Sequence, residues 1–546
     1  MTEKGVHRVI LDACSRVAGK ARIEAICLYG SRVSGYARED SDYDVLLILA
    51  EYANGVKYSY EKVDDNQLAI LIVDKKALEL DAEKGSFGDF IAGRLMSPYT
   101  PLLNAEYLED IEVKIKKRFA EEDLEDLVIE YEELARGLVI RPEYLVLARM
   151  RKRSRGYPPL RYSYINMLRE GLRDKNMTTI LRGYRRAVKE LATSKFIRVD
   201  GEAIRFENEY VDRILSSKTY NKVVNMVDFS RRALSAYITH GKAGRVKLDI
   251  FAMELTSKIK RELQTAFKRQ RIEDPKNFLF LKTDEDLMCL NEESTMVELV
   301  QKLRNEQTVE VDPLASALNE VYSITLDDEK LVVKKFTNWY TFKWFMLNIA
   351  AYGTKIFSLS GKARLANEYG INRLLAEKNV LVPEIVAISI KDRVLIERYI
   401  EGASALDFLE EAFASEELTN QQKGLAVELG KTIATIHSLH VVIGDCKPEN
   451  FIIGNNGHIY VLDLEQGERR GDPTWDVAEF LYFSGHFGTK FTDGLRDFVL
   501  NFVEGYCQIG DRSVLRRAAG FRYSRVFLGW TYLPIIQAIA SILKAL

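Results

Sequence analysis

Two short segments near the carboxyl end of the chain hold three polar side chains at fixed places around apolar strands. The segment GDCKPENFII, residues 444–453, contains Asp445 and Asn450 five positions apart, and Asp463 ends the apolar run of YVLDLE. Phosphoryl transfer needs a carboxylate beside the acceptor hydroxyl and oxygen ligands for a metal ion. The spacing therefore predicts a phosphotransferase site, in which Asp445 orients the acceptor while Asn450 and Asp463 bind Mg²⁺.

The longer stretch IHSLHVVIGDCKPENFIIGNNGHIYVLDLE resembles the catalytic and metal-binding loops of atypical kinases. The families it resembles are the RIO kinases, the small kinase subunit of the KEOPS tRNA-modification complex and the aminoglycoside phosphotransferases. Judged by the order of its motifs, the resemblance covers about residues 326–483. It implies a two-lobed protein-kinase-like fold, ATP and Mg²⁺ as cofactors, and catalytic roles for Asp445, Lys447 and Asn450.

Upstream motifs complete the resemblance. LVVKKF resembles the strand whose lysine binds nucleotide phosphates, and Lys334 is preferred to Lys335 because three apolar residues precede it. RLANEYGINRLL resembles the helix whose glutamate pairs with that lysine, which nominates Glu368. VLIERYIEG resembles the hinge strand and adds Glu397 to the nucleotide site, and DPTWDVAEFL resembles a helix start at which Asp476 braces the catalytic loop.

Several positions depart from the protein-kinase pattern. Ile443 stands where kinases often have histidine, and the metal motif reads Asp-Leu-Glu, ending at Glu465. No glycine-rich loop is visible between Pro313 and Lys334, and only twelve residues separate Asp463 from the next helix at Asp476. An ordinary protein kinase uses a long activation segment there to hold an extended peptide. RNA, a folded protein or a small molecule is therefore the expected acceptor.

A second group of polar residues lies near the amino terminus, in LYGSRVSGYAREDSDYDVLLIL. Gly30 and Ser31 follow a predicted strand and are expected to open a helix, where a backbone without Cβ and a hydroxyl can approach a phosphate. After ten further residues come Asp42 and Asp44, which point to one face if they lie on a strand. Two such carboxylates can share divalent metal ions for nucleotidyl transfer.

This spacing resembles the polymerase-β-like nucleotidyltransferases of the minimal type over about the first hundred residues. Members of that family usually add a third carboxylate from a neighbouring strand. The matching strand here is QLAILIV, and the expected position falls near Ala69. Asp64, Asp65 and Asp74 are not convincingly placed to substitute for it. Nucleotidyl transfer and simple nucleotide or RNA binding both remain open for this domain.

The middle of the chain is basic. Residues 149–198 contain fifteen Lys or Arg side chains and three acidic ones, although the whole chain has a net charge of -2. Two helical segments are followed by a hairpin signalled by Asp200-Gly201, an order that resembles a winged helix-turn-helix. Cations that neutralise phosphates and tyrosines that stack on bases predict RNA or tRNA binding, with a solvated helix face as the alternative. The residues concerned are Arg149, Arg151, Lys152, Arg153, Arg155, Arg182, Arg185, Arg186, Lys189, Tyr157, Tyr162, Tyr164 and Tyr184.

The predicted architecture is a multi-domain α/β and α+β protein. Its expected parts are a nucleotidyltransferase-like domain (1–105), a helical spacer (106–145), a basic winged-helix-like domain (146–215), a helical linker region (216–315) and a kinase-like domain (316–546). Three strands are expected in the first part, at 23–29, 43–50 and 67–73, as near-continuous apolar runs.

Five scattered cysteines without a CxxC pair argue against a disulfide framework and a structural zinc site, and favour a reducing cytoplasm. The apolar tail at 526–543 is interrupted by Pro534. It is expected to be a buried helix, with a membrane anchor as the alternative.

Four functions fit these patterns. The first is an ATP- and Mg²⁺-dependent kinase acting on RNA such as tRNA, with the basic region positioning the substrate. The second is an atypical serine/threonine protein kinase. The third is a nucleotidyltransferase acting on RNA or protein, and the fourth is a non-catalytic RNA-binding scaffold.

Overall fold

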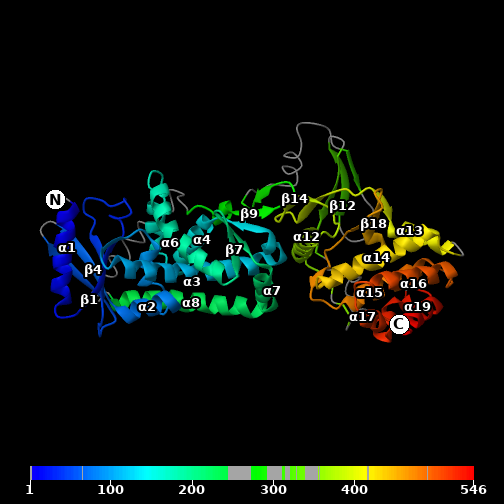
Figure 1. Cartoon of the computed structure of the whole chain (residues 1–546). Helices are drawn as coiled ribbons and strands as arrows, with labels where there is room; N and C mark the ends of the chain where they lie inside the picture. The colour runs from blue at the N-terminus through cyan, green and yellow to red at the C-terminus, as the bar shows by residue number, and fades with distance from the viewer. Residues whose placement is uncertain are drawn as a thin grey trace. The chain divides into compact units, whose positions relative to one another are not determined.

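The structure is a computed structural model in which the chain divides into two compact units (Figure 1). The first comprises Met1–Glu130, Leu138–Phe280 and Cys289–Asn291, and the second comprises Tyr131–Gly137, Leu281–Met288 and Glu292–Leu546. The residues described are 3–63, 66–243, 272–291, 310–313, 320–326, 329–338, 354–355, 357–414, 417–488, 490–529 and 531–546.

The first unit begins with a five-stranded sheet in the order β3-β4-β2-β1-β5. Its elements are α1 (Glu3–Ala18), β1 (Ile23–Tyr29), β2 (Tyr43–Leu49), β3 (Val56–Val63), β4 (Asn66–Asp74) and β5 (Thr100–Leu103). β2 and β4 are parallel, and the other pairs are antiparallel. The three strands expected from apolar runs are all present, with β1 and β2 almost wholly buried beyond their first two residues. The sequence interpretation missed β3 because its polar residues alternate with half-buried ones.

Helices and a hairpin complete this unit. They are α2 (Lys75–Lys84), η1 (Ala92–Met96), α3 (Ala105–Tyr131), β6 (Leu138–Ile140), α4 (Pro142–Gly156), α5 (Leu160–Met167), α6 (Arg173–Thr193), β7 (Ile197–Asp200), β8 (Ala203–Phe206), α7 (Asn208–Ser216) and α8 (Lys218–Ala243). Helix α8 runs along α3, to which it is joined by hydrogen bonds from Arg232 to Glu122 and from Asn225 to Asp126 (Figure 1). The long helix expected at 106–145 is thus α3, followed by a short strand.

The hairpin corrects one detail of the prediction. Asp200 pairs with Ala203, so the two turn residues are Gly201 and Glu202, not Asp200 and Gly201. Only Gly201 has a positive φ, of 60°, and one such residue is enough for this turn. The expectation that residues 216–315 are helical also fails in part. After α8, the described residues form η3 (Pro275–Phe278), β9 (Leu279–Lys282), β10 (Leu287–Cys289) and β11 (Glu310–Pro313).

The second unit combines an antiparallel sheet with a helical part. The sheet has the order β11-β12-β13-β15-β14, formed by β11, β12 (Glu320–Leu326), β13 (Glu329–Lys335), β15 (Val394–Arg398) and β14 (Ile385–Ser389). Helix α12 (Gly361–Glu377) follows β13, and the segment η2 (Glu132–Gly137), distant in sequence, packs against it. Gly370 of α12 approaches Glu133 so closely that a Cβ would lie 3.0 Å from the Glu133 carbonyl oxygen.

The helical part surrounds two small sheets, β16-β18-β19 and β17-β20. Its helices are α13 (Ala405–Ala414), α14 (Asn420–Ser438), α15 (Pro473–Ser484), α16 (Asp493–Cys507), α17 (Arg512–Ala518), α18 (Phe521–Ser524) and α19 (Leu533–Lys544). The strands are β16 (Gly402–Ser404), β17 (Val441–Val442), β18 (Phe451–Gly454), β19 (Ile459–Val461) and β20 (Glu468–Arg469). One continuous apolar core, including Phe451, Phe480 and Phe498, holds the loops between these strands in place.

The apolar tail is a packed helix. Ile535, Ile536, Ile539 and Leu543 of α19 are buried in the same core, as expected for a helix that closes the domain. Among the described helices, none combines the length and the apolar character that a membrane crossing requires.

Candidate functional sites

Lys334 lies between two buried carboxylates in the second unit. Its Nζ is 2.7 Å from Glu368 Oε1 on α12 and 2.9 Å from Glu397 Oε2 on β15. In the sheet, Lys334 of β13 pairs with Leu395 of β15. Glu397 lies two residues further along β15, on the same face as Leu395. Burial raises the pKa of Glu368 to about 7, against the opposing effect of Lys334. One oxygen of each carboxylate, Glu368 Oε2 and Glu397 Oε1, has no hydrogen-bond partner within the described structure, which leaves buried acceptor capacity beside the lysine.

The loop between β17 and β18 presents Asp445 and Lys447 side by side. Lys447 Nζ is 2.8 Å from Asp445 Oδ1, and Asn450 donates from Nδ2 to the Asp445 carbonyl oxygen at 2.8 Å. Burial lowers the pKa of Lys447, but the carboxylates of Asp445, Glu479 and Glu449 together outweigh burial, so the net shift of the pKa is upward and Lys447 stays charged. The next loop is tied to this one, since the Leu462 N–H donates to the Asn450 carbonyl oxygen at 2.8 Å.

Asp463 follows β19 with a positive φ of 53°, a backbone conformation uncommon outside glycine. Burial raises its pKa to about 7, and the nearby carboxylates of Glu368 and Asp445 add to the shift while Lys334 and Lys447 oppose it. All four of these side chains therefore lie within electrostatic reach of Asp463. A divalent cation would favour the ionised form of a carboxylate in such surroundings, so the environment of Asp463 suits a metal ligand. The metal-binding roles of Asp463 and Asn450 stay predictions.

Helix α15 braces the loop that carries Asp445. The buried carboxylate of Asp476 accepts hydrogen bonds from the N–H groups of Ile443 at 2.6 Å and Gly444 at 2.8 Å. His437 Nε2 lies 3.0 Å from the same carboxylate, which accepts its hydrogen bond, and His437 Nδ1 is 2.8 Å from the Tyr506 hydroxyl. The bracing role predicted for Asp476 is confirmed, and Ile443 contributes through its backbone.

One buried ion pair escaped the sequence interpretation. Arg364 Nη1 lies 3.0 Å from both carboxylate oxygens of Glu465, two residues after Asp463, and Asn367 Nδ2 donates to the Glu465 carbonyl oxygen at 3.1 Å. Arg364 precedes Glu368 by four residues and so lies on the same face of α12, a spacing that could have indicated it.

In the first unit, Gly30 lies directly against Asp44. A Cβ on Gly30, whose φ is 83°, would lie 2.0 Å from Asp44 Oδ2, so only glycine fits. Residues 31–35 form turns and not the predicted helix start; the Tyr36 N–H donates to the Ser31 carbonyl oxygen at 3.0 Å. Gly35, with a φ of 81°, ends the turn before a helix can propagate. Gly30, Ser31, Asp42 and Asp44 nevertheless line one cavity.

The pairing of β2 with β4 shows which residue stands at the position of the third carboxylate in the family pattern. Asp44 on β2 pairs with Ala69 on β4, so the position predicted from the family pattern is directly beside Asp44, and it carries a methyl group. Asp74 is not a substitute, because its carboxylate caps α2 through the Ala77 N–H at 3.1 Å and accepts from the Tyr52 N–H at 2.8 Å. Asp64 and Asp65 lie outside the described residues. In the described ranges, no group of three or more His, Cys, Asp or Glu side chains is arranged to hold a metal ion.

A cavity of about 840 Å³ joins this site to the middle of the chain. Its walls include Arg149 and Arg153 of α4, Tyr162 of α5 and Arg232 of α8. Arg94, another wall residue, donates to the Tyr58 hydroxyl at 3.2 Å, and neither Arg94 nor Tyr58 was anticipated. Part of the predicted nucleic-acid-binding region is therefore a wall of the N-terminal site.

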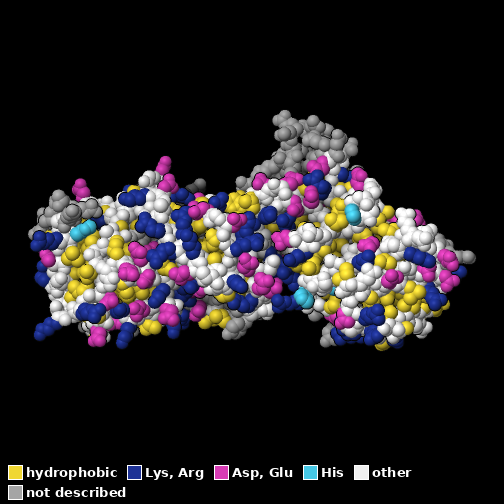
Figure 2. All heavy atoms as spheres, viewed as in Figure 1, with side chains coloured by type: hydrophobic (Ala, Val, Ile, Leu, Met, Phe, Trp, Pro, Cys, Tyr) yellow, Lys and Arg dark blue, Asp and Glu magenta, His cyan; other side chains and the backbone are white. Residues whose placement is uncertain are grey.

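Many of the basic residues carry structural ion pairs. Arg149 is 2% exposed and bonds to Asp123 at 2.8 Å, and Arg185 bonds to Glu202 at 2.9 Å. Tyr164 and Tyr184 are buried, so the prediction that they stack on bases is wrong. Figure 2 shows the resulting surface, on which Lys and Arg side chains are interspersed with Asp and Glu. Lys175, Arg182, Arg185, Arg186 and Lys189 of α6 are exposed.

Two family models match the chain. A model described as a nucleotidyltransferase domain matches residues 8–96, and one described as the lipopolysaccharide kinase (Kdo/WaaP) family matches residues 332–487. The chain thus joins an N-terminal nucleotidyltransferase domain to a C-terminal domain of the Kdo/WaaP kinase family. Both are transferase domains, of kinds that generally use a nucleoside triphosphate and a divalent metal ion.

The curated relatives match over short regions. The chain is 29% identical over 107 residues to the KEOPS complex subunit Bud32 of Pyrococcus abyssi, covering 20% of this chain and 46% of that protein. It is 27% identical over 126 residues to the cAMP-dependent protein kinase catalytic subunit 3 of Drosophila melanogaster, covering 23% of this chain and 21% of that protein. The chain therefore spans less than half the length of each relative.

Among solved structures, the complex of Rv3197 with erythromycin from Mycobacterium tuberculosis matches 29% of this chain and 46% of its own. That match has 17% identity and a TM-score of 0.20, too low to bear on the fold.

Proposed function

We propose that the chain, which joins a nucleotidyltransferase domain to a Kdo/WaaP-family kinase domain, transfers the γ-phosphate of ATP to a hydroxyl group of an RNA such as tRNA. The observation that carries the kinase half of this proposal is the position of Lys334, fixed by Glu368 and Glu397 and within electrostatic reach of Asp463. A lysine so held can bind nucleotide phosphates without losing its charge, because the two carboxylates raise its pKa.

Each residue has a separate task. Lys334 would bind the phosphates, and Asp463 and Asn450 would hold Mg²⁺, whose positive charge would stabilise the transition state. Asp445 orients the acceptor hydroxyl and takes its proton. Lys447, 2.8 Å from Asp445, contributes a second cation at the acceptor side. The antiparallel sheet with α12 and the helical part form the two lobes of a protein-kinase-like fold.

The RNA substrate is supported by the exposed cations of α6 and by the similarity to a KEOPS complex subunit. Helices α4 to α6 followed by the β7–β8 hairpin have the order of a winged helix. The five cysteines are unpaired, which suits a cytoplasmic location.

The direct test incubates the full chain with γ-labelled ATP, Mg²⁺ and total cellular RNA or protein. Label in RNA supports the proposal, and its persistence in an Asp463→Ala variant would refute the assignment of the site. Label only in protein selects the atypical protein kinase, a candidate favoured by the similarity to a protein kinase catalytic subunit.

The nucleotidyltransferase candidate is favoured by the cavity at Asp42 and Asp44. Incubation with α-labelled ATP separates it from the kinase. Loss of α-label transfer in Asp42→Ala, with Asp445→Ala unaffected, selects it. RNA binding without transfer of either label selects a non-catalytic scaffold.

A further inference from the structure

The cavity of the first unit has two chemically different ends. One, the acidic end, consists of Gly30, Ser31, Asp42 and Asp44. The other lies between the loop at 85–93, the end of α4 and helix α8. With about 840 Å³, the cavity is within the range of sites that enclose ligands of nucleotide size.

Four rings form the second end, which we call the aromatic end: Phe90, Tyr157, Tyr237 and His240. Phe90 and His240 stack with centroids 5.4 Å apart, and Tyr157 meets Tyr237 edge-on at 4.9 Å. The Tyr157 hydroxyl is 2.5 Å from His240 Nδ1, which fixes both rings. Tyr237 is 44% exposed, whereas Phe90 is 5% exposed, so Tyr237 offers ring surface to a further planar group. Aromatic side chains bind nucleotide bases in this way.

Arg94 connects the two ends. Its guanidinium carbon lies 4.7 Å from the centroid of Phe90, at the aromatic end, and 5.3 Å from that of Tyr29, which directly precedes Gly30. Arg94 therefore lies between Phe90 of the aromatic end and Tyr29, the residue before Gly30 of the acidic end. A guanidinium group at this place is suited to phosphate oxygens.

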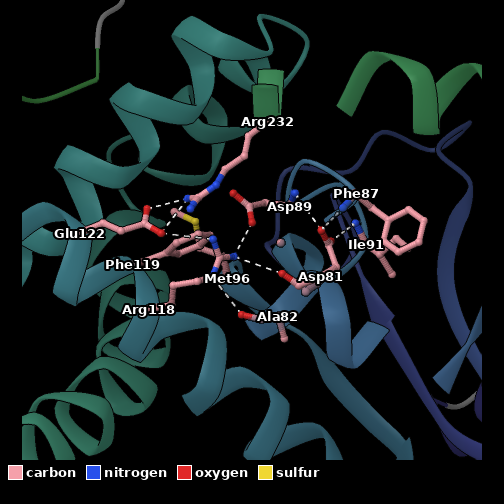
Figure 3. A network of polar contacts seen from close by, with 12 residues as sticks. Asp81, Ala82, Phe87, Asp89, Ile91, Met96, Arg118, Phe119, Glu122 and Arg232 are labelled. Atoms are coloured by element: carbon pink, nitrogen blue, oxygen red, sulfur yellow. Dashed lines mark hydrogen bonds and ion pairs between the residues drawn. The ribbon is translucent and has the colours of Figure 1, made fainter. Parts of the chain in front are cut away.

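Polar contacts fix the loop that carries Phe90 (Figure 3). The carboxylate of Asp81 accepts hydrogen bonds from four backbone N–H groups, those of Phe87, Asp89, Ile91 and Ala92, at 2.8 to 3.0 Å. Arg118 bonds to Asp89 and to Ala82. Gly88 lies against α8, where a Cβ would be 2.3 Å from the Ala236 nitrogen. The loop and the helix that carries Tyr237 are therefore held together before any ligand binds, which lowers the entropy cost of binding.

We propose that the aromatic end binds the base of a nucleoside triphosphate whose phosphates and divalent cation lie at the acidic end, with Arg94 between them. The proposal rests on the nucleotide-binding function of the N-terminal domain and assigns the residues that recognise the base. Tyr237 provides the stacking surface, and its ring is the part of the site that distinguishes a nucleotide from a bare phosphate chain.

The test measures binding calorimetrically in the full chain carrying Lys334→Met and Asp463→Asn, which disable the C-terminal site. The two probes, each with Mg²⁺, are adenosine 5′-(β,γ-imido)triphosphate and inorganic tripolyphosphate. Tyr237→Ala is expected to weaken binding of the nucleotide about ten-fold and to leave tripolyphosphate unchanged. The control is Leu234→Ala, on the same helix, 63% exposed and not part of the cavity wall, which should change neither affinity.

Two results would overturn the assignment of the base: equal affinities of both probes for the parent chain, or equal effects of Tyr237→Ala and Leu234→Ala. The underlying function is tested separately by Asp42→Asn with Asp44→Asn. If that double variant still binds both probes, the hypothesis that the N-terminal domain binds nucleotides at the acidic end is refuted. If the double variant binds neither probe while Tyr237→Ala still binds both with unchanged affinity, only the assignment of the base to the aromatic end is refuted.

Discussion

Arg364 and Glu465 form a buried ion pair in which Nη1 is 3.0 Å from both carboxylate oxygens. The arginine belongs to α12, the helix that also supplies Glu368, and the glutamate follows Asp463 by two residues. The pair therefore joins the helix whose Glu368 contacts Lys334 to the loop that carries Asp463. Both side chains are almost completely buried, at 0% and 3% exposure, so neither can be satisfied by water if the other is removed.

Removing one member of this pair should damage both stability and catalysis. We expect Arg364→Met to destabilise the second unit by roughly 3–5 kcal/mol, because it leaves a buried charge without its partner. The double variant Arg364→Met with Glu465→Met should recover stability without recovering γ-phosphate transfer, since the loop loses its connection to α12. Chemical denaturation and a kinase assay measure the two effects. Recovery of full activity in the double variant would show that the pair does not position Asp463.

The two neighbouring lysines of β13 should behave differently. Lys334→Met removes the cation between Glu368 and Glu397, and we expect γ-label transfer to fall at least about a hundred-fold, as for loss of a preorganised charge. Lys335→Met, one residue along the same strand, serves as the matched control and should retain most of the activity. Similar losses in both variants would contradict the assignment of Lys334.

The close approach of Gly30 to Asp44 predicts that the N-terminal site tolerates no side chain there. Gly30→Ala should abolish nucleotide binding to the first unit, because its Cβ would overlap the Asp44 carboxylate. Gly55→Ala is the control: its φ is also positive, at 70°, but a Cβ there meets no atom within 4 Å. Both variants should lower the free energy of unfolding by about 1 kcal/mol, because alanine disfavours a left-handed backbone conformation. Only Gly30→Ala should also lose nucleotide binding, as measured by calorimetry. Unchanged binding by Gly30→Ala would place the nucleotide elsewhere.

Glu122 gives the first unit a pH-dependent stability. Burial would raise its pKa, but Arg149, Arg232 and Arg118 outweigh burial and lower it to about 2. Figure 3 shows two of these arginines, Arg118 and Arg232, beside Glu122. Because the folded pKa is below the unfolded value of about 4.5, the stabilisation is complete above pH 4.5 and is lost as the pH falls toward 2. Over that window the loss should approach about 3 kcal/mol.

Glu122→Gln should remove this acid sensitivity, as measured by hydrogen exchange of α3 and α8 between pH 6 and about 3. The control is Glu121→Gln, at the adjacent and exposed position. Neighbouring groups partly desolvate this exposed carboxyl and raise its pKa, the opposite direction from Glu122, so Glu121→Gln should not reduce the acid loss. Parallel curves for Glu122→Gln and the parent chain would show that the three arginines do not stabilise this carboxylate.

RNA binding, if it uses α6, should depend on its exposed cations. We expect Arg182→Glu with Lys189→Glu to weaken binding and to reduce the slope of log K against log salt by about 0.7 for each phosphate that the helix no longer neutralises. Lys76→Glu with Lys84→Glu, both exposed on α2, is the control with the same change of charge. Electrophoretic shifts at several salt concentrations provide the measurement. A slope that does not change would exclude α6 from the interface.

Local sequence patterns were sufficient to predict several elements of this structure. The apolar runs of β1, β2 and β4 indicated the N-terminal strands, because strands covered on both faces need apolar residues at successive positions. The pairing of Lys334 with Glu368 and the bracing by Asp476 followed from motif order, and the hydrogen bonds and ion pairs confirm both. β3 escaped detection because one of its faces is polar, and the turn at Asp200-Gly201 was misplaced by one residue because pairing register depends on the partner strand.

By itself, the sequence identified two sets of candidate site residues, one from Asp445 to Asp463 and one from Gly30 to Asp44. It could do so because binding phosphates, metal ions and hydroxyl groups restricts which residue types occur at a fixed spacing. Only the tertiary structure decided what surrounds them. It placed Ala69 beside Asp44, joined Arg364 to Glu465, and turned Arg149, Tyr164 and Tyr184 from predicted RNA contacts into buried residues. The physical reason is that a cation or a ring serves equally well on a surface or paired inside a core, and its neighbours in space, which spacing along the chain does not specify, select between the two.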